Sequence, residues 1–201
     1  MAKKDKKELV IIGAGPGGYA AAFHAADLGI KVTLIDPEVN PGGVCLYRGC
    51  IPSKALLHLA KTKEEAMQAS KWGMKFEEPK IDIKKVASWK EKVVKKLTEG
   101  LGQLSKARNI EYIQGKAKFT GKNELEVTDN KGKTSGLSFE KVIIATGSSA
   151  VGLPELEIDH EKIWNATDAL ELKEIPKKML VVGGGYIGLE FGTAYAKMGA
   201  K

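Results

Sequence analysis

The sequence LVIIGAGPGG, residues 9–18, runs from an apolar segment directly into a glycine-rich turn. Its first four residues are apolar and mostly β-branched, which predicts a buried parallel strand. Residues 19–28 are rich in alanine and predict a helix, which we expect Gly29 to end. Residues 31–35 predict the next strand, with Asp36 at its end. Together these elements form one β-α-β unit of an α/β fold.

Gly13, Gly15 and Gly18 form a Gly-x-Gly-x-x-Gly pattern between that strand and that helix. The first glycine permits the turn, the second lets the backbone approach a pyrophosphate, and the third lets helix and strand pack closely. The helix N-terminus offers unpaired N–H groups to the same phosphates. Asp36 stands where a carboxylate accepts hydrogen bonds from a ribose. The pattern therefore predicts dinucleotide binding, although glycine-rich turns also occur for packing alone.

The same arrangement returns later, where apolar residues 179–182 precede Gly183, Gly185 and Gly188. Residues 179–182 predict a strand, and an alanine-bearing helix is expected after the glycines. We interpret this as an internal repeat of the nucleotide-binding unit. The acidic residue that would support it, and would separate NAD from NADP, is not among the 201 residues, so a packing role stays open. Two such turns favour electron transfer between two dinucleotides, with a nicotinamide nucleotide at the second.

Helices and a small antiparallel sheet are expected between the two turns. Residues 53–70 and 84–104 predict helices, and the second has apolar residues three or four positions apart with lysines between them. Residues 111–140 alternate in hydrophobicity and are interrupted by Gly, Asn and Asp, which predicts an antiparallel meander. Residues 142–145 are apolar and predict a strand that returns to the central sheet.

Composition excludes some classes of protein. A chain that is 43% hydrophobic and 28% charged is globular rather than disordered. The net charge of +7 raises the general attraction to phosphates. The lysine-rich residues 84–106 leave open a module that binds nucleic acid or an acidic partner, although such a helix face is usually just solvated. No signal peptide or membrane span is expected. The basic residues 3–7 are expected to be a solvated tail. The expected location is cytoplasmic.

Cys45 and Cys50 are the only cysteines, and they lie in GGVCLYRGCIPSK, residues 42–54. Closing so short a loop stabilises a fold by only about 2 kcal/mol, which argues against a structural staple. A zinc site needs four ligands, which argues against a metal. The other candidate ligands are three scattered histidines, His24, His58 and His160. A dithiol that opens and closes is the favoured interpretation, and two unrelated reduced cysteines are the alternative.

Charge around the cysteines predicts different roles for them. Pro52 suits the first turn of a following helix, which places Cys50 at the positive end of that helix. A thiolate there is stabilised, and Lys54 adds positive charge on about the same face. Cys45 is then the more exposed thiol, which meets the substrate, and Cys50 is the inner one.

Four blocks resemble, in order, the flavoprotein pyridine nucleotide-disulfide reductase family, and its dihydrolipoamide dehydrogenase branch most closely. They are GAGPGG, GGVCLYRGCIPSK, IIATGS and GGGYIGLE, and the cysteine block is the most specific. The resemblance implies a Rossmann-like FAD-binding domain with an antiparallel β-meander over residues 1–150. It implies the start of a second Rossmann-like domain, which binds NAD, over residues 151–201. A mercuric- or glutathione-reductase-like flavoenzyme stays open as an alternative.

The resemblance also implies which residues hold the cofactors. For FAD these are Gly13, Gly15, Pro16, Gly18, Asp36, Gly42, Gly43, Val44, Lys54, Ala117, Thr146, Gly147 and Ser148. For NAD they are Gly183, Gly185, Tyr186, Ile187, Gly188 and Glu190. Lys54 and Glu190 are implied to form an ion pair near the reactive nitrogen of the flavin. Val44 replaces the usual threonine, which removes a hydroxyl group that could contact the flavin.

The implied reaction passes electrons from dihydrolipoamide to the Cys45–Cys50 disulfide, then to FAD, then to NAD as hydride. Cys50 would face the flavin, and Cys45 would exchange with the substrate. The implied partners are the lipoyl groups of 2-oxo acid dehydrogenase complexes and, through a C-terminal domain, a second subunit; no nucleic acid, membrane or metal is implied. That domain and its His-Glu pair are not in this sequence. We therefore expect an N-terminal fragment that is inactive by itself, with a non-catalytic FAD-binding fragment as the alternative.

Overall fold

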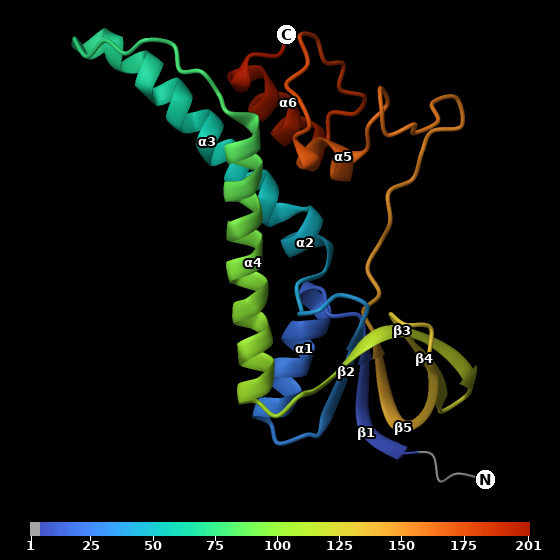
Figure 1. Ribbon diagram of the computed structural model, residues 1–201. Coiled ribbons are helices and arrows are strands. Elements are labelled where there is room, and N and C mark those ends of the chain that lie inside the picture. Colours follow the sequence, from blue (N-terminus) through green and yellow to red (C-terminus); the bar gives the residue numbers. More distant parts are fainter. Residues whose placement is uncertain (1–4) are drawn as a thin grey trace. The chain divides into compact units, whose positions relative to one another are not determined.

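The structure is a computed structural model that describes residues 5–201 (Figure 1). It contains two compact units, and each unit is assembled from two separate segments of the chain. The first unit combines the described residues up to Tyr47 with Lys96–Ser149. The second unit combines Arg48–Lys95 with Ala150–Lys201. The prediction that the functional domains divide at residue 150 stays a prediction.

One closed sheet of five strands, in the order β1-β2-β3-β4-β5, forms most of the first unit (Figure 1). The strands are β1 (Asp5–Ile12), β2 (Val32–Asp36), β3 (Glu111–Gly121), β4 (Glu124–Asp129) and β5 (Thr134–Ile144). β1 pairs in parallel with β2 and β5, and β2 pairs in parallel with β3. β4 pairs antiparallel with β3 and β5. This mixed sheet, together with its helices, confirms the predicted α/β class.

Two strands belong to both the parallel and the antiparallel part of the sheet. β3 pairs with β2 up to Gln114 and with β4 from Gly115 onward. β5 pairs with β4 from Thr134 to Ser138, and its pairing with β1 continues to Ile144. The predicted meander and the predicted return to the parallel sheet are therefore confirmed. However, β5 is one continuous strand where the sequence predicted two, because no turn residue interrupts it after Gly136.

The apolar run in β1 is explained by burial on both faces of the sheet. Leu9 and Ile11 face a cluster that includes α1 (Pro16–Asp27), whereas Val10 and Ile12 face the interior of the closed sheet. Side chains alternate between the faces of a strand, so a strand buried on both faces must be apolar throughout. The interior cluster is completed by Ile35, Leu125, Val127, Leu137 and Phe139.

The expected solvated tail over residues 3–7 is wrong for Lys6 and Lys7. Both belong to β1, because the pairing of β1 with β5 extends back to Asp5. Lys7 lies 2.9 Å from the carboxylate of Glu111, and its side chain is largely buried. Lys3 and Lys4 lie outside the described residues.

Helices dominate the second unit. Its elements are α3 (Cys50–Gln68), the short 3-10 helix η1 (Ala69–Trp72), the first half of α4 (Ile83–Ala107), α5 (Ala166–Glu171) and α6 (Tyr186–Met198). α2 (Gly43–Arg48) precedes α3 in the chain. α3 and α6 pack against each other, and their core contains Leu56, Ala60, Phe191, Ala194 and Tyr195. Among residues 5–201, no helix is both long and apolar enough to cross a membrane.

The helix predicted over residues 84–104 is confirmed as α4, but its apolar positions do not mark its buried face. Trp89 is 39% exposed and Leu97 is 42% exposed, whereas Lys90 is only 4% exposed. The ammonium group of Lys90 donates a hydrogen bond to the carbonyl of Leu170, which satisfies the buried charge. Polar groups on this face are therefore tolerated because they find specific acceptors.

The strand predicted over residues 179–182 is wrong: the segment is neither helix nor strand. Leu180 is 87% exposed and Val182 is 64% exposed. Two backbone hydrogen bonds hold the start of the segment, from the N–H of Met179 to Lys201 and from the N–H of Lys201 to Lys177. A strand needs neighbours along its edges to satisfy its backbone, and within the described residues no further strand supplies them.

A buried tyrosine ties α6 to α5. Tyr195 is 1% exposed, and its hydroxyl donates a 2.7 Å hydrogen bond to the carbonyl of Ala169. Burial raises the pKa of Tyr195 to about 12, so the hydroxyl keeps its proton. We expect Tyr195→Phe to lower the free energy of unfolding in urea by about 1–2 kcal/mol, because the buried carbonyl loses its donor. Tyr186 is 73% exposed, so Tyr186→Phe should change the free energy of unfolding by less than about 0.5 kcal/mol. Equal losses of stability in the two variants would contradict this explanation.

Candidate dinucleotide turns and redox disulfide

The first glycine turn connects β1 to α1 and leaves no room for side chains. Gly13 has a φ of +97°, and a Cβ atom placed on it would lie 2.3 Å from the carbonyl oxygen of Ala145. A Cβ atom on Gly18 would lie 1.8 Å from the carbonyl oxygen of Gly13. The first and third glycines of the pattern are therefore required by the packing of the turn itself, as the sequence predicted for the third.

Gly15 is available to a ligand and lies beside Gly43. A Cβ atom on Gly43 would lie 2.4 Å from the Cα of Gly15, so the two backbones approach closely. The N–H of Gly42 donates a 2.8 Å hydrogen bond to the carbonyl of Ala14. Pro16 starts α1, and no described side chain caps this helix. The turn therefore presents bare backbone and a helix N-terminus whose N–H groups are not satisfied by a side chain.

Asp36 lies at the end of β2 and is 8% exposed. One carboxylate oxygen accepts a 2.7 Å hydrogen bond from the N–H of Ala14, and the other accepts a 2.9 Å bond from the N–H of Glu38. Each carboxylate oxygen can accept a second hydrogen bond. Asp36 thus holds the first turn in place and retains the capacity to bind ribose hydroxyl groups, which stays a prediction.

Further residues predicted for FAD in the first unit lie within β3 or after β5. Thr146 comes after β5, and its Cα would lie 3.2 Å from a Cβ atom on Gly13, which places it at the first turn. Gly147 has a φ of +72°, and Ser148 follows it. Ala117, by contrast, pairs with Val127 in the antiparallel part of β3 and packs against the interior cluster.

Cys45 and Cys50 form a disulfide, which confirms the predicted pairing. Cys45 lies in α2, and Cys50 is the first residue of α3. Pro52 is the third residue of α3, which therefore begins earlier than the sequence predicted. The position of Cys50 at the helix start puts its sulfur where the partial positive charge of the helix stabilises a thiolate.

Lys54 and Glu190 form the predicted ion pair, with 2.5 Å between the ammonium nitrogen and one carboxylate oxygen. Ser53, which is 5% exposed, donates a 2.9 Å hydrogen bond to the other oxygen of Glu190. The sequence reasoning did not single out Ser53, and its place in the Pro-Ser-Lys block was the available signal. Together these contacts link the start of α3 to Glu190 in the second turn of α6. That the pair lies near a flavin stays a prediction.

The Lys54 hydrogen bond holds the pKa of Glu190 below its ordinary value of 4.5, and Ser53 acts in the same direction. A carboxylate whose pKa is depressed by folding stabilises the fold above its unfolded-state pKa, and this contribution is lost as the pH falls through the folded-state pKa. We expect Glu190→Gln to lower the melting temperature at pH 6–7 and to match the unmodified chain near pH 3. Glu157 is exposed, so Glu157→Gln should show no such pH dependence. If the difference in melting temperature between Glu190→Gln and the unmodified chain grew as the pH fell, the expected direction of the effect would be wrong.

The second glycine turn shares the positive φ of its first glycine and the tight packing of its third glycine with the first turn, but no strand directly precedes it. Gly183 has a φ of +111°, and a Cβ atom on Gly188 would lie 2.2 Å from the carbonyl oxygen of Gly183. Gly185 precedes α6, and no described side chain caps that helix. Tyr186 and Ile187, also predicted for NAD, are exposed at the helix start. A shallow cavity of about 480 Å³ is lined by Gly183, Gly184 and Gly188 of this turn.

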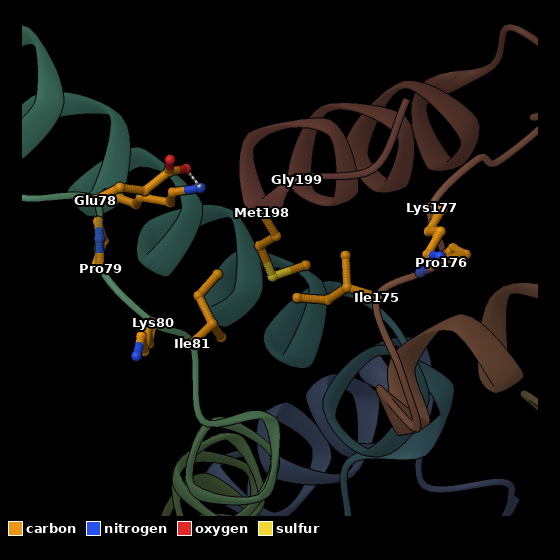
Figure 2. A pocket seen from close by; sticks show the side chains of 10 residues that line it. Glu78, Pro79, Lys80, Ile81, Ile175, Pro176, Lys177, Met198 and Gly199 are labelled. Atoms are coloured by element: carbon orange, nitrogen blue, oxygen red, sulfur yellow. Dashed lines mark ion pairs between the residues drawn. The ribbon is translucent and has the colours of Figure 1, made fainter.

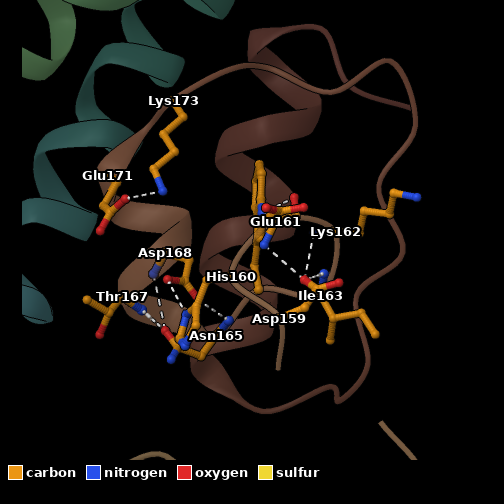
Figure 3. A network of polar contacts seen from close by, with 11 residues as sticks. Asp159, His160, Glu161, Lys162, Ile163, Asn165, Thr167, Asp168, Glu171 and Lys173 are labelled. Atoms are coloured by element: carbon orange, nitrogen blue, oxygen red, sulfur yellow. Dashed lines mark hydrogen bonds and ion pairs between the residues drawn. The ribbon is translucent and has the colours of Figure 1, made fainter. Parts of the chain in front are cut away.

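Two other features of the second unit contain no predicted site residue. Figure 2 shows a cavity of about 530 Å³, lined by apolar Met198 and by the ion-paired Lys63 and Glu78. Figure 3 shows a polar network in which His160 lies 2.9 Å from Asp168, and Asp168 completes the capping box of α5. The network therefore stabilises a helix start. Among residues 5–201, no three acidic, histidine or cysteine side chains are arranged to hold a metal ion.

Two glycine turns, each before a helix, and a disulfide at a helix start are features of dinucleotide-dependent disulfide oxidoreductases. The chain belongs to the pyridine nucleotide-disulphide oxidoreductase family, whose sequence profile matches residues 7–201. This membership supports the α/β nucleotide-binding fold predicted from the sequence.

Similar proteins agree on the type of enzyme. The chain is 50% identical to the dihydrolipoyl dehydrogenase of Vibrio cholerae and 48% identical to that of Haemophilus influenzae. Both matches cover 100% of this chain but only 42% of the relative. The structure resembles the HOCl-induced flavoprotein disulfide reductase RclA of Escherichia coli in its Cu(II) complex, with a TM-score of 0.82 and 31% identity, over 98% of this chain and 41% of that one. The chain thus spans less than half the length of these proteins.

Proposed function

We propose that this chain is the FAD-binding and disulfide-bearing part of a dihydrolipoyl dehydrogenase, which oxidises dihydrolipoamide and reduces NAD. The observation that carries the proposal is the Cys45–Cys50 disulfide at the start of α3. The relatives at 48–50% identity over the whole chain favour this substrate over the mercuric- and glutathione-reductase alternatives.

The first turn fits FAD. Gly15 and Gly43 offer a backbone cradle, the N-terminus of α1 is uncapped by side chains, and Asp36 retains acceptor capacity. These groups would hold the pyrophosphate and a ribose. When bound, FAD would supply the two-electron carrier between the thiols and the nicotinamide.

The disulfide would carry out the exchange with substrate. One thiolate of dihydrolipoamide attacks the sulfur of Cys45, forms a mixed disulfide and releases Cys50 as a thiolate. The second substrate thiol, once deprotonated, closes the lipoamide ring and releases Cys45. The substrate loses two electrons and two protons, and the protein gains a dithiol. The start of α3 stabilises the Cys50 thiolate and so favours Cys50 as the leaving group.

The second turn would hold NAD, through Gly183, Gly185 and Gly188. By this proposal residues 1–150 belong to the FAD-binding domain and residues 151–201 begin the NAD-binding domain. The proposed partners are the lipoyl groups of 2-oxo acid dehydrogenase complexes and a second subunit. The proposed location is the cytoplasm, where a disulfide of this kind can be reduced.

The test combines flavin binding with thiol release. When FAD is titrated with the purified chain, the flavin fluorescence should fall until the binding is saturated. Dihydrolipoamide added to this complex should then produce a long-wavelength thiolate–flavin absorbance band. We expect no turnover of NAD by the 201 residues alone. FAD binding without reduction of the disulfide would support the non-catalytic alternative, and absence of both would overturn the proposal.

A further inference from the structure

Helix α2 carries Cys45 and is only six residues long. A helix this short has little stability of its own, so contacts with the rest of the fold must hold it. Leu46 supplies one such contact and is 7% exposed. The disulfide to Cys50 is a second, covalent restraint on α2. Because the proposed reaction opens the disulfide, the noncovalent contacts of α2 decide where the sulfur of Cys45 lies afterwards.

Tyr47 supplies the most directional of these contacts. Its hydroxyl donates a 3.1 Å hydrogen bond to the backbone carbonyl of Asn40. Tyr47 also has a side-chain hydrogen bond with Thr98 of α4, which is 3% exposed. Burial raises the pKa of Tyr47 above its ordinary value of 10.0, so the hydroxyl keeps its proton and remains a donor. Its ring lies against the backbone, because a Cβ atom on Gly42 would lie 3.1 Å from the Cε2 of Tyr47.

The hydrogen bond of Tyr47 does not compete with the chemistry of Cys45. The two residues are two positions apart on α2, and residues with this spacing do not share a helix face. The Tyr47 hydroxyl can therefore stay on its acceptor while the sulfur of Cys45 exchanges. The disulfide and the hydrogen bond are two separate restraints on the same short helix.

The loop that accepts this hydrogen bond is itself held at both ends. Its first two carbonyls accept side-chain hydrogen bonds, from Gln114 and Asn130 to Pro37 at 3.1 Å and from Tyr112 to Glu38 at 2.9 Å. Asn40 packs closely on α4, since a Cβ atom on Gly102 would lie 2.2 Å from its side-chain oxygen. The N–H of Gly42, at the other end of the loop, donates to the carbonyl of Ala14. A side chain tied to this loop is therefore tied to a fixed point.

We propose that Tyr47 is a positioning residue for the thiol–disulfide exchange, whose hydrogen bond to Asn40 holds α2 in place while the disulfide is open. Cys45 then stays near Cys50, and closing the disulfide again costs less conformational freedom. This inference rests on the proposed function only in taking the disulfide to be one that opens. It requires neither FAD nor NAD.

The test is a redox equilibrium between the chain and glutathione. The reduced chain gives two electrons and two protons to glutathione disulfide, so one protein disulfide and two molecules of glutathione form. Alkylation of the remaining thiols, followed by mass spectrometry of the intact chain, measures the oxidised fraction. We expect Tyr47→Phe to lower the equilibrium constant for closing the disulfide roughly fivefold, because α2 moves more freely in the reduced chain without this hydrogen bond. Phenylalanine keeps the ring, so circular dichroism should show an unchanged fold.

The redox constant separates positioning from stability. A residue that stabilises the oxidised and reduced chains equally leaves this constant unchanged, even if its loss lowers the free energy of unfolding. Tyr19→Phe is the matched control on α1, because among residues 5–201 the hydroxyl of Tyr19 has no hydrogen-bond partner. It should leave the constant unchanged.

Thr98→Val tests whether the effect passes through the Tyr47 hydroxyl. By itself it should lower the constant by a smaller factor than Tyr47→Phe does, because the hydroxyl keeps its bond to Asn40. Added to Tyr47→Phe it should have no further effect, since residues that act through one shared contact are not additive. A full additional loss in the double variant would show that Thr98 acts independently of Tyr47 and would contradict this part of the inference.

Two outcomes overturn the proposal. The first is a constant that is unchanged or higher in Tyr47→Phe, and the second is an equal fall in Tyr19→Phe. The proposed function fails separately: a chain that binds no FAD, but whose redox constant still falls in Tyr47→Phe, would contradict that function and support the role of Tyr47.

Discussion

Gly18→Ala is expected to unfold the first unit under conditions in which the unmodified chain is stable. The added Cβ would lie 1.8 Å from the carbonyl oxygen and 2.8 Å from the carbonyl carbon of Gly13. Both are backbone atoms at the end of β1, so relief requires α1 to move away from the sheet. Overpacking typically costs about 1–3 kcal/mol, and a clash with backbone atoms falls at the upper end, which is a large part of the stability of a small domain. The measurement is urea unfolding followed by circular dichroism.

Gly17→Ala is the matched control for this prediction. It makes the same chemical change one residue earlier in α1, where a Cβ would meet nothing within 4 Å. Alanine is favoured over glycine in helices by up to about 1 kcal/mol, so this variant should be as stable as the unmodified chain or more so. If both variants lost stability equally, the close approach between α1 and β1 could not be the cause.

Cys50→Ser is expected to remove all thiol–disulfide cycling. The unmodified chain should release two thiols per molecule on reduction, detected with a chromogenic disulfide, and close them again on oxidation. With serine at position 50, the single Cys45 thiol should attack the chromogenic disulfide, release one chromogenic thiolate and keep the other half as a lasting mixed disulfide, because the chain has no second thiol to displace it. Mass spectrometry of the intact adduct identifies this species.

Cys45→Ser separates the roles of the two sulfurs. Cys50 then stands alone at the start of α3, where the helix stabilises its thiolate. If Cys45 is the exchanging sulfur, the adduct should form at least roughly tenfold more slowly in this variant than in Cys50→Ser. If the adduct formed faster in Cys45→Ser than in Cys50→Ser, Cys50 would be the exchanging sulfur instead. Both cysteines would still be required for cycling.

Short-range patterns allowed both glycine turns to be predicted. The alternation of β1 between two buried faces and the spacing of Gly13 and Gly18 are properties of fewer than twenty consecutive residues. The clashes that a Cβ would cause at Gly13, Gly18 and Gly188 are the physical basis of that spacing. The disulfide was predictable for the same reason, because its two cysteines are close in sequence.

Features that depend on distant partners could not be predicted. Nothing near Lys90 in the sequence indicates that the carbonyl of Leu170 accepts a hydrogen bond from its ammonium group, so a lysine on the buried face of α4 was unexpected. Ser53 acquires its role only through Glu190 on another helix. The segment 179–182 shows the converse: its composition favours a strand, but a strand forms only when neighbouring segments satisfy its backbone.

The interleaving of the two units restricts the order in which the chain can fold during synthesis. The sheet of the first unit cannot close until β5 has been made, since β1 is its neighbour in the ring. Leu56 and Ala60 on α3 are fully buried, yet Phe191 on α6, which completes their core, is translated much later than they are. Contacts between such distant residues form slowly, and uncovered apolar surfaces attract chaperones or other nascent chains. Helix α3 therefore reaches its final surroundings only after α6 has left the ribosome.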